Sequence, residues 1–140
     1  MLQQVIGRAV FNDKVALVIE DDAHSLIALG SLLKSLHIQY KRNTTGAKVL
    51  QQARRLLPDF VLLDMDLPDG DPFLIRAALR SDPELSKVPI IAIADSRLME
   101  NLRLDIEKSS FAGCLPKPVA HQDFEELLRD VLNNDDELPH

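Results

Sequence analysis

The 140-residue chain lacks several features by which other classes of protein are recognised. Its single cysteine, Cys114, cannot form an intrachain disulfide, which favours a protein of the reducing cytoplasm. No apolar run approaches the roughly 20 residues that a membrane-spanning helix requires. The amino terminus has neither the basic start nor the long apolar stretch of a secretory signal. Because the formal net charge is −6, we expect neither nucleic acid nor an anionic membrane surface as a direct partner.

The length and composition that are present fit one globular domain. Hydrophobic residues make up 46% of the chain and charged residues 27%, which is ordinary for a protein with a single core. Internal repeats and low-complexity segments are absent. We expect an amino-terminal arm or short helix over residues 1–13, a domain over residues 14–133 and an acidic tail over residues 134–140.

Short apolar runs alternate with amphipathic segments along this domain. Residues 15–19, 60–63 and 90–94 are apolar throughout, as in strands buried on both faces of a parallel sheet, and shorter strands are expected at 38–41 and 113–115. Between and after them, apolar residues spaced by three and four predict helices near residues 26–36, 47–57, 72–80, 98–106 and 124–132. Five alternations of strand and helix predict an α/β fold with a doubly wound parallel sheet and helices on both faces.

Charged residues follow three of the predicted strands. Glu20 and Asp21 come after the first strand, Asp64 after the third and Lys117 after the fifth. Because parallel strands end at the same edge of a sheet, we expect these side chains to lie together. Crowded carboxylates repel one another without a cation, and oxygen ligands suit Mg²⁺. A carboxylate beside a divalent metal and a lysine is suited to accept a phosphoryl group.

Four segments in this arrangement resemble the motifs of response regulator receiver domains. They are Val-Ile-Glu-Asp-Asp at 18–22, Leu-Leu-Asp-Met-Asp-Leu-Pro at 62–68, Pro-Ile-Ile-Ala-Ile at 89–93 and Leu-Pro-Lys-Pro at 115–118. The resemblance covers residues 14–133 and implies a flavodoxin-like fold with strand order 2-1-3-4-5. It also implies that Asp64 is the phosphoacceptor and that Lys117 contacts the phosphoryl group, with a cis peptide bond before Pro118. The residues that it assigns to Mg²⁺ are Glu20, Asp21, Asp64 and, through its backbone carbonyl, Asp66.

Two positions depart from the pattern of the family. Ala94 stands where receivers usually have Thr or Ser, whose hydroxyl bonds the phosphoryl group, and Cys114 stands where they usually have an aromatic residue that reports the switch. The resemblance therefore implies the carboxylate chemistry without its usual readout. Apart from these roles, we expect Cys114 to be a small buried filler. We expect Asp22 to cap the first helix and Ser96 to cap the fourth.

Three functions are open from the sequence. The resemblance favours a stand-alone cytoplasmic receiver in a two-component system or phosphorelay, which takes a phosphoryl group from a histidine kinase or histidine phosphotransfer protein. It would signal by protein contact through its fourth helix, fifth strand and fifth helix, and it could also form a homodimer. Its only enzymatic activity would be self-catalysed phosphotransfer and autodephosphorylation. Ala94 and Cys114 favour instead a pseudo-receiver that binds partners without phosphorylation-driven switching. Asp64-Met65-Asp66 also resembles the Asp-x-Asp motif of haloacid-dehalogenase-like phosphatases, but that motif belongs on a first strand.

Overall fold

The structure is a computed structural model that describes residues 11–68 and 70–137, with side chains as far as residue 132. Most of the predicted arm over residues 1–13 lies outside the described residues, as do the last three residues of the predicted tail. Within the described part of the chain, no helix is both long enough and apolar enough to cross a membrane.

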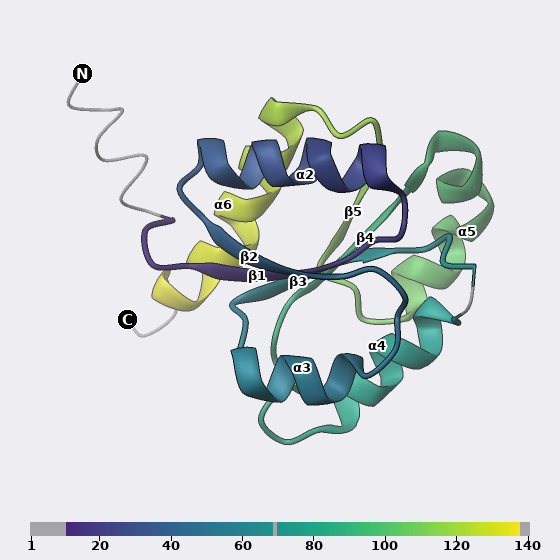
Figure 1. The fold of residues 1–140 in the computed structure, drawn as a ribbon, viewed down its shortest axis with the longest axis horizontal. Helices are drawn as coiled ribbons and strands as arrows, with labels where there is room; N and C mark the ends of the chain where they lie inside the picture. Colours follow the sequence, from purple (N-terminus) through teal and green to yellow (C-terminus); the bar gives the residue numbers. More distant parts are fainter. Residues whose placement is uncertain (1–10, 69, 138–140) are drawn as a thin grey trace.

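Strands and helices alternate through the described chain, as the sequence predicts (Figure 1). The strands are β1 (Val15–Ile19), β2 (Gln39–Asn43), β3 (Phe60–Asp64), β4 (Ile90–Asp95) and β5 (Gly113–Lys117). The helices are α2 (Ala23–Ser35), α3 (Val49–Leu56), α4 (Pro72–Ser81), α5 (Ser96–Lys108) and α6 (His121–Glu137). All strand pairs are parallel and the order is β2-β1-β3-β4-β5, which confirms the predicted flavodoxin-like, doubly wound sheet.

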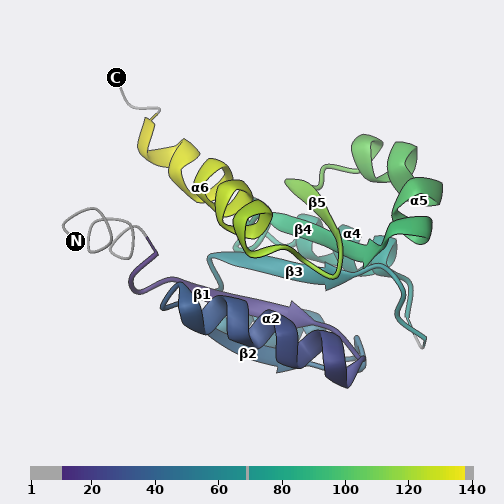
Figure 2. The ribbon, with the colours of Figure 1, turned by 90° about the horizontal axis from the view of Figure 1, so that it is seen from above.

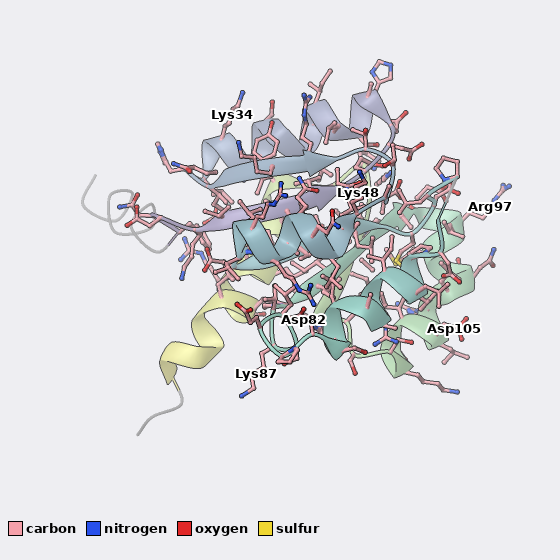
Figure 3. The ribbon with its side chains drawn as sticks, turned by 60° about the horizontal axis from the view of Figure 1, so that its bottom comes forward. Lys34, Lys48, Asp82, Lys87, Arg97 and Asp105 are labelled. Atoms are coloured by element: carbon pink, nitrogen blue, oxygen red, sulfur yellow. The ribbon has the colours of Figure 1, made fainter. Side chains whose placement is uncertain are left out.

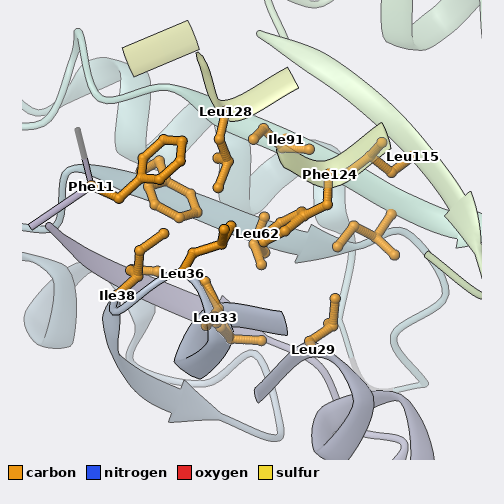
Figure 4. Close-up of a cluster of buried hydrophobic side chains, with 14 of the residues drawn as sticks. Phe11, Leu29, Leu33, Leu36, Ile38, Leu62, Ile91, Leu115, Phe124 and Leu128 are labelled. Atoms are coloured by element: carbon orange, nitrogen blue, oxygen red, sulfur yellow. The ribbon is translucent and has the colours of Figure 1, made fainter. Parts of the chain in front are cut away.

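The sheet separates two layers of helices, with α2 and α6 on one face and α3, α4 and α5 on the other (Figures 1 and 2). Alternate residues of the central strands point to opposite faces. Val18 and Leu62 pack against α2 and α6 in the cluster of Figure 4, whereas Leu17 and Leu63 pack against α3, α4 and α5. Strand β3 is buried along its whole length, including Asp64. The most buried strand therefore ends in a carboxylate.

Several element boundaries differ from the prediction for local reasons. The second predicted helix, α3, begins at Val49 and not at residue 47, because the Asn43 side chain accepts hydrogen bonds from the Thr45 and Gly46 N–H groups and holds a turn. Strand β5 continues to Lys117, since its Pro116 lies on an edge strand where a missing N–H is tolerated. Helix α6 continues to Glu137, into the segment that was predicted to be a tail.

One of the two predicted helix caps is confirmed. The Asp22 carboxylate accepts a hydrogen bond of 2.8 Å from the Ser25 N–H and caps α2. The prediction for Ser96 is wrong, because α5 is capped by Asp95, whose carboxylate accepts a 2.8 Å hydrogen bond from the Leu98 N–H. Both residue types are good caps, and the helix begins one residue earlier than a Ser96 cap requires.

Candidate functional site

Four charged side chains from three strand ends lie together at the carboxyl edge of the sheet. Glu20 directly follows β1, and Asp64 and Lys117 are the last residues of β3 and β5. One carboxylate oxygen from each of Glu20, Asp21 and Asp64 lies within 4.8 Å of the others. The Nζ atom of Lys117 lies 2.7 Å from Oε1 of Glu20 and 3.4 Å from Oδ1 of Asp64. Glu20, Asp21, Asp64 and Lys117, which were named as candidates from the sequence, thus lie together.

Burial divides the acids of this site into two kinds. Glu20 and Asp64 are 1% and 2% exposed, whereas Asp21 is exposed to solvent. The ammonium of Lys117 is the cation paired with both buried acids among the described residues. Two buried carboxylates therefore share one positive charge, and the site is acidic overall.

The charge imbalance changes the pKa values of the site. Burial, together with the hydrogen bond and the negative charge of Glu20, raises the pKa of Asp64 to about 6, against the opposing effects of the Asp66 N–H and Lys117. Burial by itself would lower the pKa of Lys117. The hydrogen bond to Glu20 and the charges of both acids outweigh this effect, so the pKa of Lys117 is raised. Lys117 is therefore held in its charged form.

Backbone groups fix the two buried carboxylates. The Asp66 N–H donates to Oδ1 of Asp64 at 3.0 Å, and the Asp22 N–H donates to Oε2 of Glu20 at 3.4 Å. The side chain of Asp66 itself is exposed. The peptide bond between Lys117 and Pro118 is cis, as the resemblance to receivers implied.

Asn43 supports this site and was not singled out from the sequence. The backbone carbonyl oxygen of Asn43 accepts a 3.0 Å hydrogen bond from the Glu20 N–H. Its buried side chain donates to the Ala47 carbonyl and the Gln52 side chain and accepts from the two N–H groups of the following turn. The available signal was an Asn three residues before a Gly, which is typical of a turn but gives no sign of burial.

The two unusual positions differ from one another in the structure. Ala94 is completely buried near the end of β4, and its methyl group can donate no hydrogen bond. The prediction that Cys114 is a buried filler is wrong, because its side chain is exposed. Strand β5 lies at the edge of the sheet and turns the neighbouring residue, Leu115, inward, so Cys114 points outward.

The donor set of the site fits a hard divalent cation. Glu20, Asp21 and Asp64 offer carboxylate oxygens close enough to share one ion, and neither His nor Cys belongs to this group. Oxygen-only ligands with one exposed side, where water can complete the coordination, suit Mg²⁺ better than a transition metal. Such a cation would also offset the negative charge of Glu20, which adds to the effect of burial in raising the pKa of Asp64.

Comparison with known proteins agrees with this geometry. The family model of the response regulator receiver domain matches residues 16–129. The polar-differentiation response regulator DivK of Brucella ovis is 25% identical over 124 residues, which cover 86% of this chain and 98% of DivK.

Solved structures share the fold. A putative response regulator from Chloroflexus aurantiacus J-10-fl superposes with a TM-score of 0.79 at 21% identity, covering 86% of this chain and 98% of the other. The receiver domain of the sensor histidine kinase PA1611 from Pseudomonas aeruginosa PAO1, solved with a magnesium ion coordinated in its active site cleft, has a TM-score of 0.78 at 22% identity with the same coverage. Since the family model matches most of the chain, the protein belongs to the response regulator receiver domain family.

Proposed function

We propose that this receiver accepts a phosphoryl group on Asp64 from the phosphohistidine of a histidine kinase or histidine phosphotransfer protein. The observation that carries the proposal is a buried carboxylate at a strand end, 3.4 Å from an ammonium group and beside two further acids. The signal would then pass to a downstream protein by contact with α5, β5 and α6.

The transfer that this site supports is a direct displacement. A carboxylate oxygen of Asp64 attacks phosphorus, the new P–O bond forms as the P–N bond of the donor breaks, and the imidazole leaves. The hydrogen bond from Asp66 and the contact with Lys117 both fall on Oδ1, which leaves Oδ2 as the attacking atom. Lys117 is close enough to Asp64 to neutralise an oxygen of the incoming phosphoryl group.

Mg²⁺ is the cofactor that goes with this proposal. Glu20, Asp21, Asp64 and the backbone carbonyl of Asp66 are the groups that would hold it. When bound, it supplies positive charge against the phosphoryl oxygens. The chain's own contribution is to keep Glu20 and Asp64 buried and fixed in position by the backbone N–H groups of Asp22 and Asp66.

A small phosphodonor tests the proposal. The protein is incubated with acetyl phosphate or phosphoramidate and Mg²⁺, and its intact mass is measured. We expect a gain of one phosphoryl group that is absent in Asp64→Asn and retained in Asp105→Asn, a control in which the altered acid is exposed on α5. No gain of mass, under conditions that label an ordinary receiver, would contradict the proposal.

A second candidate function is a pseudo-receiver that binds partners without a phosphorylation-driven switch. It is favoured by Ala94, a fully buried methyl group where a hydroxyl is usual, and by the exposed thiol of Cys114. Amide spectra with and without beryllofluoride plus Mg²⁺ separate the two candidates. Shifts confined to the edge of the sheet around Asp64 would support the pseudo-receiver, and shifts that spread through α5 and β5 would support a switching receiver.

A further inference from the structure

Asp95 is an acid beside the site to which the proposed transfer gives no role. It is the last residue of β4, the strand that lies between β3 and β5 in the sheet. Its Oδ1 atom accepts the 2.8 Å hydrogen bond from the Leu98 N–H that caps α5, so the carboxylate is held in one place. Asp95 is exposed and forms no ion pair with any side chain that the structure describes.

The register of the sheet places this charge next to Asp64 and Lys117. Asp95 is paired with Lys117 of β5, and Ile93, two residues before Asp95, is paired with Asp64 of β3. Because neighbouring strands lie about 4.8 Å apart and rise about 3.3 Å per residue, the Cα atom of Asp95 lies about 8 Å from that of Asp64. Asp95 therefore borders the space through which a phosphodonor must approach Asp64.

Positive groups nearby offset the charge of Asp95 only in part. The ammonium of Lys117 is already paired with Glu20 and Asp64. The amino end of α5 contributes about half a positive charge, which is less than the full negative charge of the carboxylate that caps it. Arg97, in the first turn of α5, is exposed and projects outward from the helix in Figure 3. A phosphodonor therefore meets a net negative charge on this side of the site.

We propose that Asp95 makes the site discriminate between phosphodonors by their charge, an inference that rests on the proposed function of Asp64. Acetyl phosphate, whose phosphoryl group is bonded to oxygen, carries two negative charges at neutral pH. Phosphoramidate and phosphohistidine, whose phosphoryl group is bonded to nitrogen, carry less negative charge because that nitrogen can hold a proton. Asp95 repels the first kind of donor more strongly, so the site favours the phosphohistidine of a protein over small acyl phosphates.

Asp95→Asn tests the proposal, because Asn also caps helices and only the charge is removed. Intact mass gives the rate of phosphorylation by acetyl phosphate, whose P–O bond breaks to release acetate, and by phosphoramidate, whose P–N bond breaks to release ammonia. Both rates are measured at saturating Mg²⁺ and low ionic strength. We expect Asp95→Asn to raise the rate about four- to tenfold with acetyl phosphate but only about two- to threefold with phosphoramidate, since repulsion scales with the charge of the donor. Added salt should shrink both effects.

A titration with Mg²⁺ alone, followed by amide shifts of the unphosphorylated protein, gives a readout that does not depend on transfer. The charge that repels an anionic donor attracts a cation. We therefore expect Asp95→Asn to bind Mg²⁺ about threefold more weakly than the unaltered protein. A role of Asp95 in capping α5 alone would change neither the Mg²⁺ affinity nor the preference between donors.

Asp105→Asn is the matched control. It removes the same charge from an exposed position on α5, ten residues or about 15 Å along the helix from Asp95 (Figure 3). We expect it to leave both rates and the Mg²⁺ affinity unchanged. Equal acceleration with both donors, the same acceleration in Asp105→Asn, or an unchanged Mg²⁺ affinity in Asp95→Asn would overturn the proposal. Failure of both donors to label the unaltered protein would contradict the proposed function of Asp64 instead, so the two failures are distinguishable.

Discussion

The ammonium group of Lys117 lies closer to Glu20 than to Asp64, at 2.7 Å against 3.4 Å. Lys117 therefore has a role before any phosphoryl group is bound, because its positive charge compensates the carboxylate of Glu20, which is only 1% exposed. A buried carboxylate that loses its cation keeps the full cost of its desolvation. The same lysine thus supports both the folded state and the proposed chemistry.

Replacing Lys117 tests this relationship directly. We expect Lys117→Gln to lower the free energy of unfolding by about 2–3 kcal/mol at neutral pH without divalent metal, since two buried acids lose their shared cation. Because the pKa of Lys117 is raised on folding, its contribution is fully present below its ordinary pKa of 10.5 and is lost as pH rises from there through the folded pKa. Urea unfolding measures the change. Lys87→Gln, at an exposed position without an ion pair in the described chain, is the control, and an equal loss there would contradict the prediction.

The raised pKa of Asp64 predicts that the charged form of this side chain destabilises the folded protein, whereas the charged form of Lys117 stabilises it. Between about pH 4 and pH 6 the folded protein holds a proton that the unfolded chain has released, because the pKa rises from 3.8 to about 6 on folding. Stability therefore falls as pH rises through this window. In chelator at about pH 8 we expect Asp64→Asn to be more stable than the unaltered protein by about 1–2 kcal/mol, and we expect the difference to vanish near pH 4. Urea unfolding at both pH values checks this, and a less stable Asp64→Asn at pH 8 would contradict it.

The fold and the strand-end acids could be predicted because their signals are local. An apolar run that stops at an acid marks both a buried strand and its carboxyl end, so Glu20 and Asp64 were identified with the elements that carry them. Cys114 could not be placed in this way. Whether its side chain points inward depends on the position of β5 at the edge of the sheet and on the inward turn of Leu115, and neither follows from three residues of strand sequence.

Asn43 shows the same limit for a polar residue. In the sequence it stands among Lys, Arg and Thr and has the character of an exposed turn. Its burial comes from β2 ending beside β1 and from the return of α3 over the turn, which brings Gln52 and Ala47 within hydrogen-bonding distance. Such hydrogen bonds form only once the tertiary structure brings the partners together, so no local sequence pattern predicts them.

These contacts predict a large effect for Asn43→Ala. The substitution removes four hydrogen bonds and leaves the Thr45 and Gly46 N–H groups without their acceptor, so we expect unfolding to become easier by about 2–3 kcal/mol. Thermal and urea unfolding measure it. Gln51→Ala, at an exposed position on α3, should change stability by less than about 0.5 kcal/mol. A loss in Asn43→Ala no greater than in this control would show that the turn is held by its backbone alone.

Introducing a hydroxyl at position 94 tests whether Ala94, which stands where receivers usually have Thr or Ser, weakens the conformational change proposed to follow phosphorylation. Ala94 is fully buried, so we expect Ala94→Ser to destabilise the fold by about 1 kcal/mol, because a hydroxyl enters an apolar layer. With beryllofluoride and Mg²⁺, its amide shifts in α5 should be larger than those of the unaltered protein, which has no hydroxyl at this position. Ala92→Ser is the matched control, since Ala92 is equally buried on the same face of β4 but lies farther from the carboxyl edge of the sheet. If Ala92→Ser spread the shifts as far, the cause would be looser packing of β4 and not the hydroxyl.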